Sequence, residues 1–463
     1  MYEFLEYVLS ELRTSLIWAV LAGMVSLIVL GTVWLWYCRK GRKFPWGKAI
    51  LWLMFIGYCA VVAYATILRG VGGYREWNLH LFRAWREAWN NFSAKNWANV
   101  LLNVAMFVPL GFLLPLLGKK FRKWYLTIPA GFCVSLAIEL FQLAIGRGIC
   151  DVDDLFCNAL GGMIGFFAVM LVLSLAGKKW KCSLVYGGLA LALVVGIGSI
   201  FIVYEIKEYG NLPNAPAYIN DTSGTVWTLE CELPSIDAEL LVYRTQTRSI
   251  ADCDAFAEDF RQIIGTEYTT ISYYQEAAYY MDQFGDENGT HFLFVNYLDP
   301  GYEYSCGWGD NPVWTDADRD TIEAALSHLP VFIPEYAEFA VEGNGWHTFT
   351  VEQHIDGANL VDGVLRCRYA EDGTIRELQN SLLTYTYYAS EKFIPSEKAY
   401  ENLKDGKFYD RGFYEAKAPA DVRVQSCTLS YAIDTKGFYQ PVYLFDVASP
   451  DGSYRDRIMI PAL

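Results

Sequence analysis

A short polar turn between two long apolar runs carries most of the side chains in this sequence that could do chemistry. The stretch from Glu139 to Gly165 reads ELFQLAIGRGICDVDDLFCNALGGMIG. Ionisable groups beside or within spanning-length apolar segments are energetically costly and mark candidate functional positions. With polar residues of the preceding segments, the candidate cluster comprises Arg69, Asn103, Glu139, Gln142, Arg147, Asp151, Asp154 and Asn158.

The spacing of the acidic residues supports two interpretations. Asp151, Asp154 and Asn158 share one face of a helix that begins near Asp151. In the first interpretation Asp151 is an N-cap and Asp154 stabilises the positive end of the helix. In the second, these residues line an outward-facing polar pocket together with Glu139, Gln142 and Arg147. An isolated charge at the depth of Glu139 costs about 2.5–3.5 kcal/mol or more, so that residue must be protonated or face a partner.

Six apolar segments must position these side chains. Each has roughly the 20 residues that a membrane-spanning helix needs. They are residues 16–37, 49–68, 98–117, 125–145, 155–176 and 184–204. We therefore expect an α-helical integral membrane domain at 1–204, a linker at 205–224 that is rich in Pro, Gly and Asn, and a second domain at 225–463.

Charge separates the two parts and predicts their orientation. Residues 1–204 carry 19 Lys and Arg against 9 Asp and Glu, whereas the rest of the chain carries 18 against 43. Basic clusters follow the first, third and fifth apolar segments, at 38–43, 119–123 and 178–181, and such loops stay in the cytoplasm. The N-terminus and residues 205–463 are then extracytoplasmic. The acidic second part argues against nucleic-acid binding.

Two segments before the polar turn leave alternatives open. The Trp- and Arg-rich loop at 69–97 is either an interfacial segment or a lid over the polar cluster, with Arg69 reaching the cluster. In the third apolar segment, Pro109 and Gly111 interrupt helical regularity, which indicates a kink or a cavity. Gly161 and Gly165 have the spacing that lets another helix approach closely.

These residues together resemble the VanZ-like family of bacterial membrane proteins over about residues 60–175. The resemblance lies in an Asn before an F-x-P-x-G segment, then E-x-x-Q, an Arg, D-x-x-D, an Asn and glycines. The matching positions are Asn103, Phe107, Pro109, Gly111, Glu139, Gln142, Arg147, Asp151, Asp154, Asn158, Gly161 and Gly165. This family is associated with resistance to the glycopeptide antibiotic teicoplanin, so the resemblance implies a cell-envelope role and no particular reaction.

The second part of the chain predicts an α+β domain with an antiparallel sheet. Helix start signals stand at Ser249, Thr315 and Ser396, and six strand-like runs begin at 239, 291, 364, 382, 425 and 440. One arrangement is two similar lobes, 225–312 and 313–463. The C-terminal stretch weakly resembles PepSY-type extracytoplasmic domains of Gram-positive surface proteins. Five cysteines in this part allow one or two disulfides, and the cysteines form no zinc pattern.

Three functional hypotheses follow. The first is a binding protein whose outward polar pocket takes a membrane lipid, a lipid-linked cell-wall precursor or a glycopeptide. The second is an enzyme on a lipid-linked phosphate substrate, in which Glu139, Asp151 and Asp154 hold a divalent metal or act as acid and base, while Arg69 and Arg147 bind phosphate. The third is a transporter. No metal site, catalytic residue or oligomeric state is predicted from the sequence itself.

Overall fold

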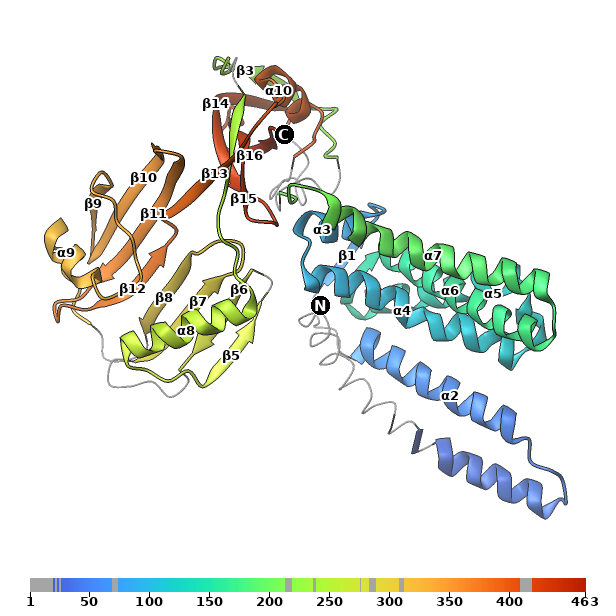
Figure 1. Cartoon of the computed structure of the whole chain (residues 1–463). Coiled ribbons are helices and arrows are strands. Elements are labelled where there is room, and N and C mark those ends of the chain that lie inside the picture. The colour runs from blue at the N-terminus through green and yellow to red at the C-terminus, as the bar shows by residue number, and fades with distance from the viewer. Residues whose placement is uncertain are drawn as a thin grey trace. The chain divides into compact units, whose positions relative to one another are not determined.

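The chain divides into two compact units, Met1–Glu208 and Tyr209–Leu463. Figure 1 shows the computed structural model, which describes residues 20, 23–24, 26–68, 74–212, 219–235, 239–274, 276–282, 289–307, 312–408 and 419–463. The first unit is mainly helical and the second is built mainly of strands (Figure 1).

The described part of the first unit contains five helices that are long and apolar enough to cross a membrane. Its elements are Ser26–Arg39, α2 (Trp46–Ala63), the π-helix Tyr64–Leu68, β1 (Tyr74–Asn78), α3 (Arg83–Asn91), α4 (Ala94–Leu117), the 3-10 helix Lys119–Arg122, α5 (Trp124–Ile145), β2 (Arg147–Asp151), α6 (Val152–Ala176) and α7 (Trp180–Ile206). The segment expected at 16–37 lies partly outside the described residues, and its described portion is the shorter apolar helix Ser26–Arg39. The expected count of six spans is therefore not confirmed.

Close packing of α4 against α6 forms the centre of this unit. A Cβ atom at Gly161 would lie 1.9 Å from the carbonyl oxygen of Val104, and one at Gly165 would lie 2.0 Å from that of Val108. Gly111 approaches the backbone of Gly162 equally closely from the α4 side. Although Pro109 lies inside α4, the helix runs without a break from Ala94 to Leu117. These glycines allow the two backbones to touch, which fixes the polar ends of both helices relative to each other.

The segment between α2 and α4 is structured where it is described. β1 pairs in parallel with β2, so the stretch before α3 lies beside the turn that joins α5 to α6. Trp85 and Trp89 of α3 pack with Trp97 of α4 in one hydrophobic cluster. The segment is thus held by both strand pairing and side-chain packing.

The second unit is a sheet-rich domain in which nearly all strands are antiparallel. Its helices are α8 (Ile250–Ile264), α9 (Arg319–Leu326) and α10 (Ser396–Lys404). Its strands are β3 (Val226–Leu229), β4 (Leu240–Arg244), β5 (Thr270–Tyr273), β6 (Ala277–Met281), β7 (Thr290–Asn296), β8 (Tyr302–Gly307), β9 (Glu338–Gly343), β10 (Trp346–Asp356), β11 (Asn359–Tyr369), β12 (Ile375–Asn380), β13 (Leu383–Glu391), β14 (Asp421–Ile433), β15 (Phe438–Ala448) and β16 (Arg455–Pro461). The main path of hydrogen-bonded strands runs β3-β14-β15-β4-β13-β11-β12-β8-β7-β6-β5. Only the β3–β14 pair is parallel among the described strands of this sheet.

The described part of this unit has three hydrophobic clusters, and the two largest pack its helices against the sheet. The larger cluster packs α8 and α9 onto the sheet and extends in sequence from Cys253 to Leu382, so it includes residues on both sides of position 312. The smaller cluster packs α10 against β14, β15 and β16. All eleven cysteines of the chain lie in the described part and none forms a disulfide bond, so the disulfides considered from the sequence are not formed.

Candidate functional site

Glu139 and Asp151 meet where α5 turns back into α6. Helix α5 ends at Gly146, whose positive φ of 66° lets the chain leave the helix sharply, and β2 then leads to Asp151, the N-cap of α6. The backbone N–H of Asp151 donates to Oε2 of Glu139 at 3.3 Å. Glu139 is only 3% exposed. Its side chain therefore points into the protein and faces the start of the next helix.

Asp151 joins three elements through hydrogen bonds. Its Oδ1 accepts from the backbone N–H of Asp153 at 2.8 Å, which is the expected N-cap interaction. Its Oδ2 accepts from Nδ2 of Asn78 at the end of β1, at 2.9 Å. The capping interpretation thus describes part of what Asp151 does, and the contact with β1 adds a second role.

Asp154 and Asn158 extend the polar face of α6 by one turn each. Nδ2 of Asn103 on α4 donates to Oδ1 of Asp154 at 2.5 Å. Nδ2 of Asn158 donates to Oγ of Ser135 on α5 at 2.8 Å. Ser135 lies one turn before Glu139, so Asn158 lies one turn beneath the carboxylates. Its buried Oδ1 has no hydrogen-bond partner among the described groups.

Three carboxylates, on Glu139, Asp151 and Asp154, therefore lie close enough to repel one another. Their described hydrogen-bond donors are the amides of Asn78 and Asn103 and backbone N–H groups. Asp151 and Asp154 are half-buried residues. We refer to Glu139, Asp151, Asp154, Asn78, Asn103 and Asn158 as the carboxylate–amide cluster. Carboxylate oxygens arranged in this way can accept hydrogen bonds from hydroxyl or ammonium groups.

The other predicted site residues lie elsewhere or outside the described part. Nε2 of Gln142 donates to the backbone carbonyl of Thr66 at 2.7 Å, so Gln142 binds the π-helical end of α2 instead of the carboxylates. The backbone of Arg147 belongs to β2, but its side chain is not among those described, and Arg69 lies outside the described residues. The proposed contact of both arginines with phosphate stays a prediction.

Asp153 is a functional candidate that the sequence reasoning did not select. It is completely buried, and its two oxygens accept from the backbone N–H groups of Phe82 at 2.5 Å and Ala84 at 2.6 Å. A carboxylate at this place caps the N-terminus of α3 from another helix and favours its positive dipole end. The only signal in the sequence is that a third aspartate lies between two that were selected.

Among the described residues, no group of three or more His, Cys, Asp or Glu side chains could hold a metal ion. The chemistry that these positions offer directly is hydrogen bonding and charge complementarity.

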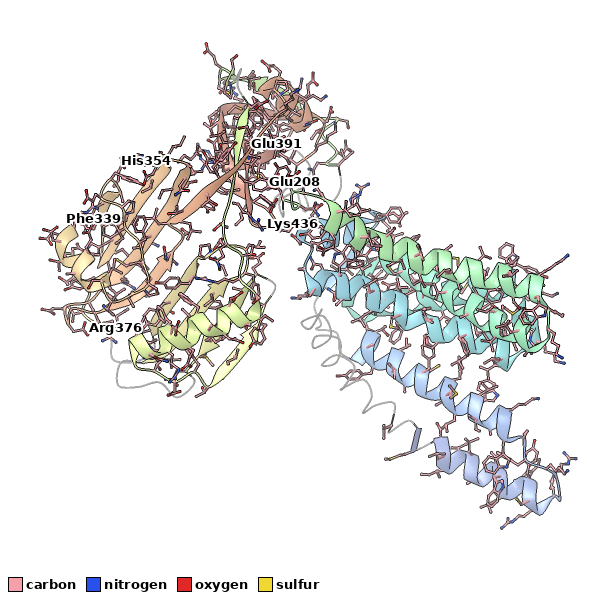
Figure 2. The ribbon with its side chains drawn as sticks, in the orientation of Figure 1. Glu208, Phe339, His354, Arg376, Glu391 and Lys436 are labelled. Carbon is pink, nitrogen blue, oxygen red and sulfur yellow. The ribbon has the colours of Figure 1, made fainter. Side chains whose placement is uncertain are left out.

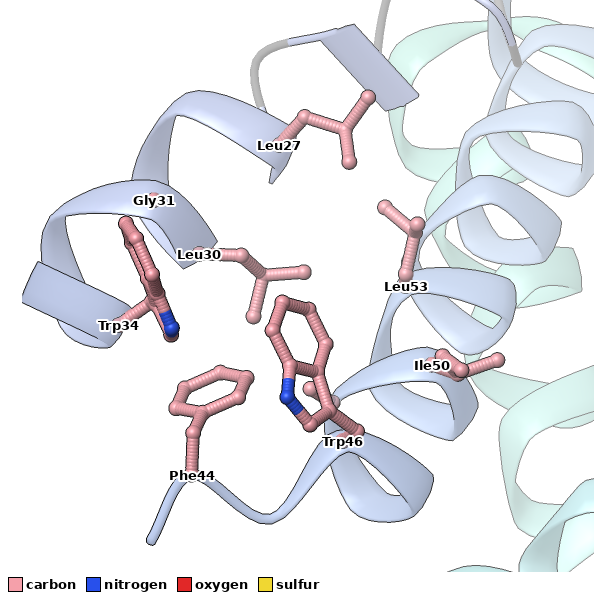
Figure 3. Close-up of a pocket in the computed structure, with 9 residues that line it drawn as sticks. Leu27, Leu30, Gly31, Trp34, Phe44, Trp46, Ile50 and Leu53 are labelled. Carbon is pink, nitrogen blue, oxygen red and sulfur yellow. The ribbon is translucent and has the colours of Figure 1, made fainter. Parts of the chain in front are cut away.

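A separate cavity of about 230 Å³ lies between helix Ser26–Arg39 and α2. Figure 3 shows Trp34, Phe44 and Trp46 around it together with aliphatic side chains. It is lined by Leu27, Leu30, Gly31, Trp34, Phe44, Trp46, Ala49, Ile50 and Leu53. Such a mainly apolar lining suits a hydrocarbon chain.

Spanning-length apolar helices joined to a separate antiparallel sheet define a multi-pass membrane protein with a sheet-rich domain. Residues 46–173 match the family model described as VanZ/LLP1. The membrane unit is therefore VanZ-like over these residues, as the ordered motif predicted, and the match begins earlier than residue 60.

Among curated proteins, none matches this chain. Among solved structures, the chain is similar to the "Bacillus megaterium YpeB C-terminal domain", with 14% sequence identity and a TM-score of 0.20, over 47% of this chain and 94% of that one. A likeness at this level carries no conclusion about fold or function, and the PepSY-type resemblance of the C-terminal part stays a prediction.

Proposed function

We propose that the VanZ-like membrane unit binds the polar head of an amphipathic cell-envelope molecule at the carboxylate–amide cluster. The head group carries hydroxyl or ammonium groups, as lipid-linked cell-wall precursors and glycopeptides do. The bound molecule keeps its apolar part in the surrounding lipid. The protein acts by binding, and the acidic sheet-rich unit is an extracytoplasmic accessory domain.

The observation that carries this proposal is the convergence of Glu139, Asp151 and Asp154 with amide groups from two other elements. Placing carboxylates together near the end of membrane helices destabilises the unit unless a ligand or a proton compensates their charge. Ammonium groups compensate it directly, and sugar hydroxyls satisfy the remaining oxygen lone pairs.

The surroundings of the cluster support an amphipathic ligand. The segment that leads into α3 exposes Trp77 and Leu79, with exposed fractions of 59% and 75%. Apolar side chains of this kind lie at the level of the lipid head groups when they flank spanning helices. A ligand at the cluster would then have a polar site beside an apolar rim.

The test is binding to the full chain in lipid nanodiscs. A lipid-linked cell-wall precursor and teicoplanin are titrated separately, with affinity measured by calorimetry and folding checked by thermal unfolding. Glu139→Gln and Asp154→Asn keep the side-chain shape and remove the charge. Since a hydrogen bond to a charged group contributes about 1.5–3 kcal/mol, each substitution is expected to weaken binding by roughly tenfold to a hundredfold.

Glu87→Gln provides the matched control, because Glu87 forms a partly exposed ion pair with Arg83 on α3. Its removal should leave the affinity unchanged. The proposal is wrong if neither ligand binds the wild-type chain, or if both cluster variants fold normally and bind as well as the wild type.

A further inference from the structure

Three neighbouring strands of the second unit bring a thiol, an imidazole and a guanidinium together. Cys306 on β8 is the direct cross-strand partner of His291 on β7. On the other side of β8, the register of β12 places Leu378 opposite Tyr304. Since side chains two residues apart share a face of a strand, Arg376 falls on the face of Leu378 and beside Cys306.

The distances within this group are those of polar contacts to sulfur. Nε2 of His291 lies 4.0 Å from Sγ of Cys306, and Nη1 of Arg376 donates to the same sulfur at 3.8 Å. Nδ1 of His291 lies 3.0 Å from the hydroxyl oxygen of Tyr304. An imidazole nitrogen and a guanidinium cation therefore lie beside the sulfur, and the hydroxyl of Tyr304 orients the imidazole ring.

Arg376 is held in place by groups other than the thiol. Its Nη2 donates to Asp372 at 2.7 Å and its Nε to Thr374 at 2.9 Å (Figure 2 labels Arg376). Only Nη1 of its fork is directed to Cys306 by a described contact. A guanidinium is always charged, so this anchoring presents a fixed positive charge to the sulfur.

The site is largely closed to solvent. Cys306 is 7% exposed, and the side chain of Arg376 is 12% exposed. A site of this kind excludes peptides and other bulky substrates but can admit a molecule of a few atoms.

We propose that Cys306, paired with His291 and Arg376, is a thiolate site that reacts with small hydroperoxides. His291 accepts the thiol proton in the reaction step, and the guanidinium stabilises the negative sulfur. Thiolates next to positive side chains are the reactive form of cysteine, and oxidation follows thiolate character. This site is independent of the binding function proposed for the membrane unit.

The step balances within these groups and the peroxide. The thiolate attacks one peroxide oxygen, an S–O bond forms, and the O–O bond breaks. The leaving hydroxide takes the proton of His291 and becomes water. Sulfur is oxidised by two electrons to a sulfenic acid and the peroxide is reduced. Two equivalents of an added thiol then restore Cys306, through a mixed disulfide and the release of water.

Other cysteines of the same unit provide internal comparisons. Cys231 is more exposed than Cys306, and burial raises the pKa of its thiol. Cys367 is fully buried, and burial raises the pKa of its thiol to about 12. If exposure alone governed reactivity, Cys231 would react before Cys306.

The experiment uses the full chain in detergent at pH 6.5, where an ordinary thiol is only about 1% ionised. Dilute hydrogen peroxide is added with dimedone, which traps sulfenic acids, and mass spectrometry measures the modified fraction at each cysteine. We expect labelling at Cys306 to exceed that at Cys231 by about tenfold or more, with none at Cys367. Labelling at Cys306 that is equal to or lower than at Cys231 would overturn the proposal.

Variants separate a reactive site from a merely accessible one. Arg376→Met should reduce labelling of Cys306 by about tenfold, whereas Arg376→Lys, which keeps the charge, should retain part of it. His291→Gln should also reduce labelling. Thermal unfolding shows which variants fold. If a variant does not fold, the relative labelling of Cys306, Cys231 and Cys367 in the wild-type chain still tests the proposal. Folded Arg376→Met protein with unchanged labelling contradicts the proposal.

Discussion

Asp153 and Asp154 are neighbours in the sequence, yet their carboxylates bind quite different partners. Asp153 turns toward the backbone N–H groups of Phe82 and Ala84, and Asp154 turns toward the side chain of Asn103. Consecutive helical residues differ by 100° in direction, which accounts for the divergence. The first residue holds α3 in place and the second belongs to the carboxylate–amide cluster.

Replacing Asp153 should therefore destabilise the membrane unit. In Asp153→Asn the charge is lost and the amide nitrogen opposes a backbone donor, so we expect a loss of about 1–3 kcal/mol in the free energy of unfolding. Tryptophan fluorescence during thermal unfolding in detergent measures this change, because Trp85 and Trp89 report on α3. A melting temperature equal to that of the wild type would show that the two hydrogen bonds do not hold α3.

At the level of single residues, side-chain spacing could predict part of the cluster. The i, i+3, i+7 pattern on α6 and the depth of Glu139 in α5 led to side chains that the structure brings together. The role of Asp153 could not be predicted, because backbone N–H groups about seventy positions earlier bind it and every residue except proline has such a group. The position of Gln142 depends on a π-helical carbonyl, which also leaves no pattern in the sequence.

Among the helices, the contact between α4 and α6 depends on glycines at defined positions. Gly161 and Gly165 face the backbone of α4, whereas a Cβ at the neighbouring Gly162 would meet no atom within 4 Å. Gly161→Ala should force the helices apart and lower the melting temperature of the membrane unit, since the added atom meets the carbonyl of Val104 at 1.9 Å. Gly162→Ala is the matched control and should be tolerated. Equal melting temperatures for the two variants would contradict this account of the packing.

The sheet-rich unit has its own anchor in Asp434. This buried carboxylate accepts from the backbone N–H groups of Gly210 at 2.6 Å, Lys436 at 2.7 Å and Phe438 at 2.9 Å, and from Nε2 of Gln440. It thereby ties the first residues of the unit to the turn between β14 and β15.

Asp434→Asn should destabilise the sheet-rich unit by about 1–3 kcal/mol, because the amide nitrogen must oppose at least one of these donors. Denaturant unfolding of the full chain, followed by circular dichroism of the sheet, measures the change. Asp259→Asn, at an exposed position of α8, serves as the control and should have a small effect. An Asp434→Asn midpoint within error of that control would refute the anchoring role.

Capping signals predicted the helices of this unit better than residue patterns predicted its strands. Ser249 and Asp252 form the expected capping box of α8, and Gly265 ends that helix with a φ of 71°. Helix α9 begins after Asp318 instead of Thr315, because the Asp318 side chain accepts from the N–H of Thr321. Strands β9 and β10 were not predicted from the sequence. The Asn344-Gly345 turn between them is nevertheless a recognisable hairpin signal, because both residues have positive φ.

For the whole molecule, apolar length and charge were the informative features. They predicted a helical membrane part followed by an acidic domain, and the structure has spanning-length helices in the first unit and an antiparallel sheet in the second. Spanning helices alternate in direction, so the loops at 119–122 and 177–179 lie at one end of the bundle. The turn that bears Asp151 and the exit of α7 lie at the other end. The chain therefore leaves α7 at the same end of the helical bundle as the carboxylate–amide cluster.

The last prediction concerns the side of the membrane on which this end of the helical bundle lies. Basic loops remain in the cytoplasm, so the sheet-rich unit and the cluster should both face outward. Protease added to intact protoplasts should remove the residues beyond about 210 and leave the membrane helices. A membrane-impermeant maleimide gives an independent measurement, because Cys38 and Cys182 are exposed and lie beside basic clusters at the opposite face. Both should be labelled only after permeabilisation. Labelling of Cys38 and Cys182 in intact protoplasts, together with a protease-protected C-terminal unit, would show the opposite orientation. The cluster would then face the cytoplasm, where it could not bind a ligand presented from outside the cell.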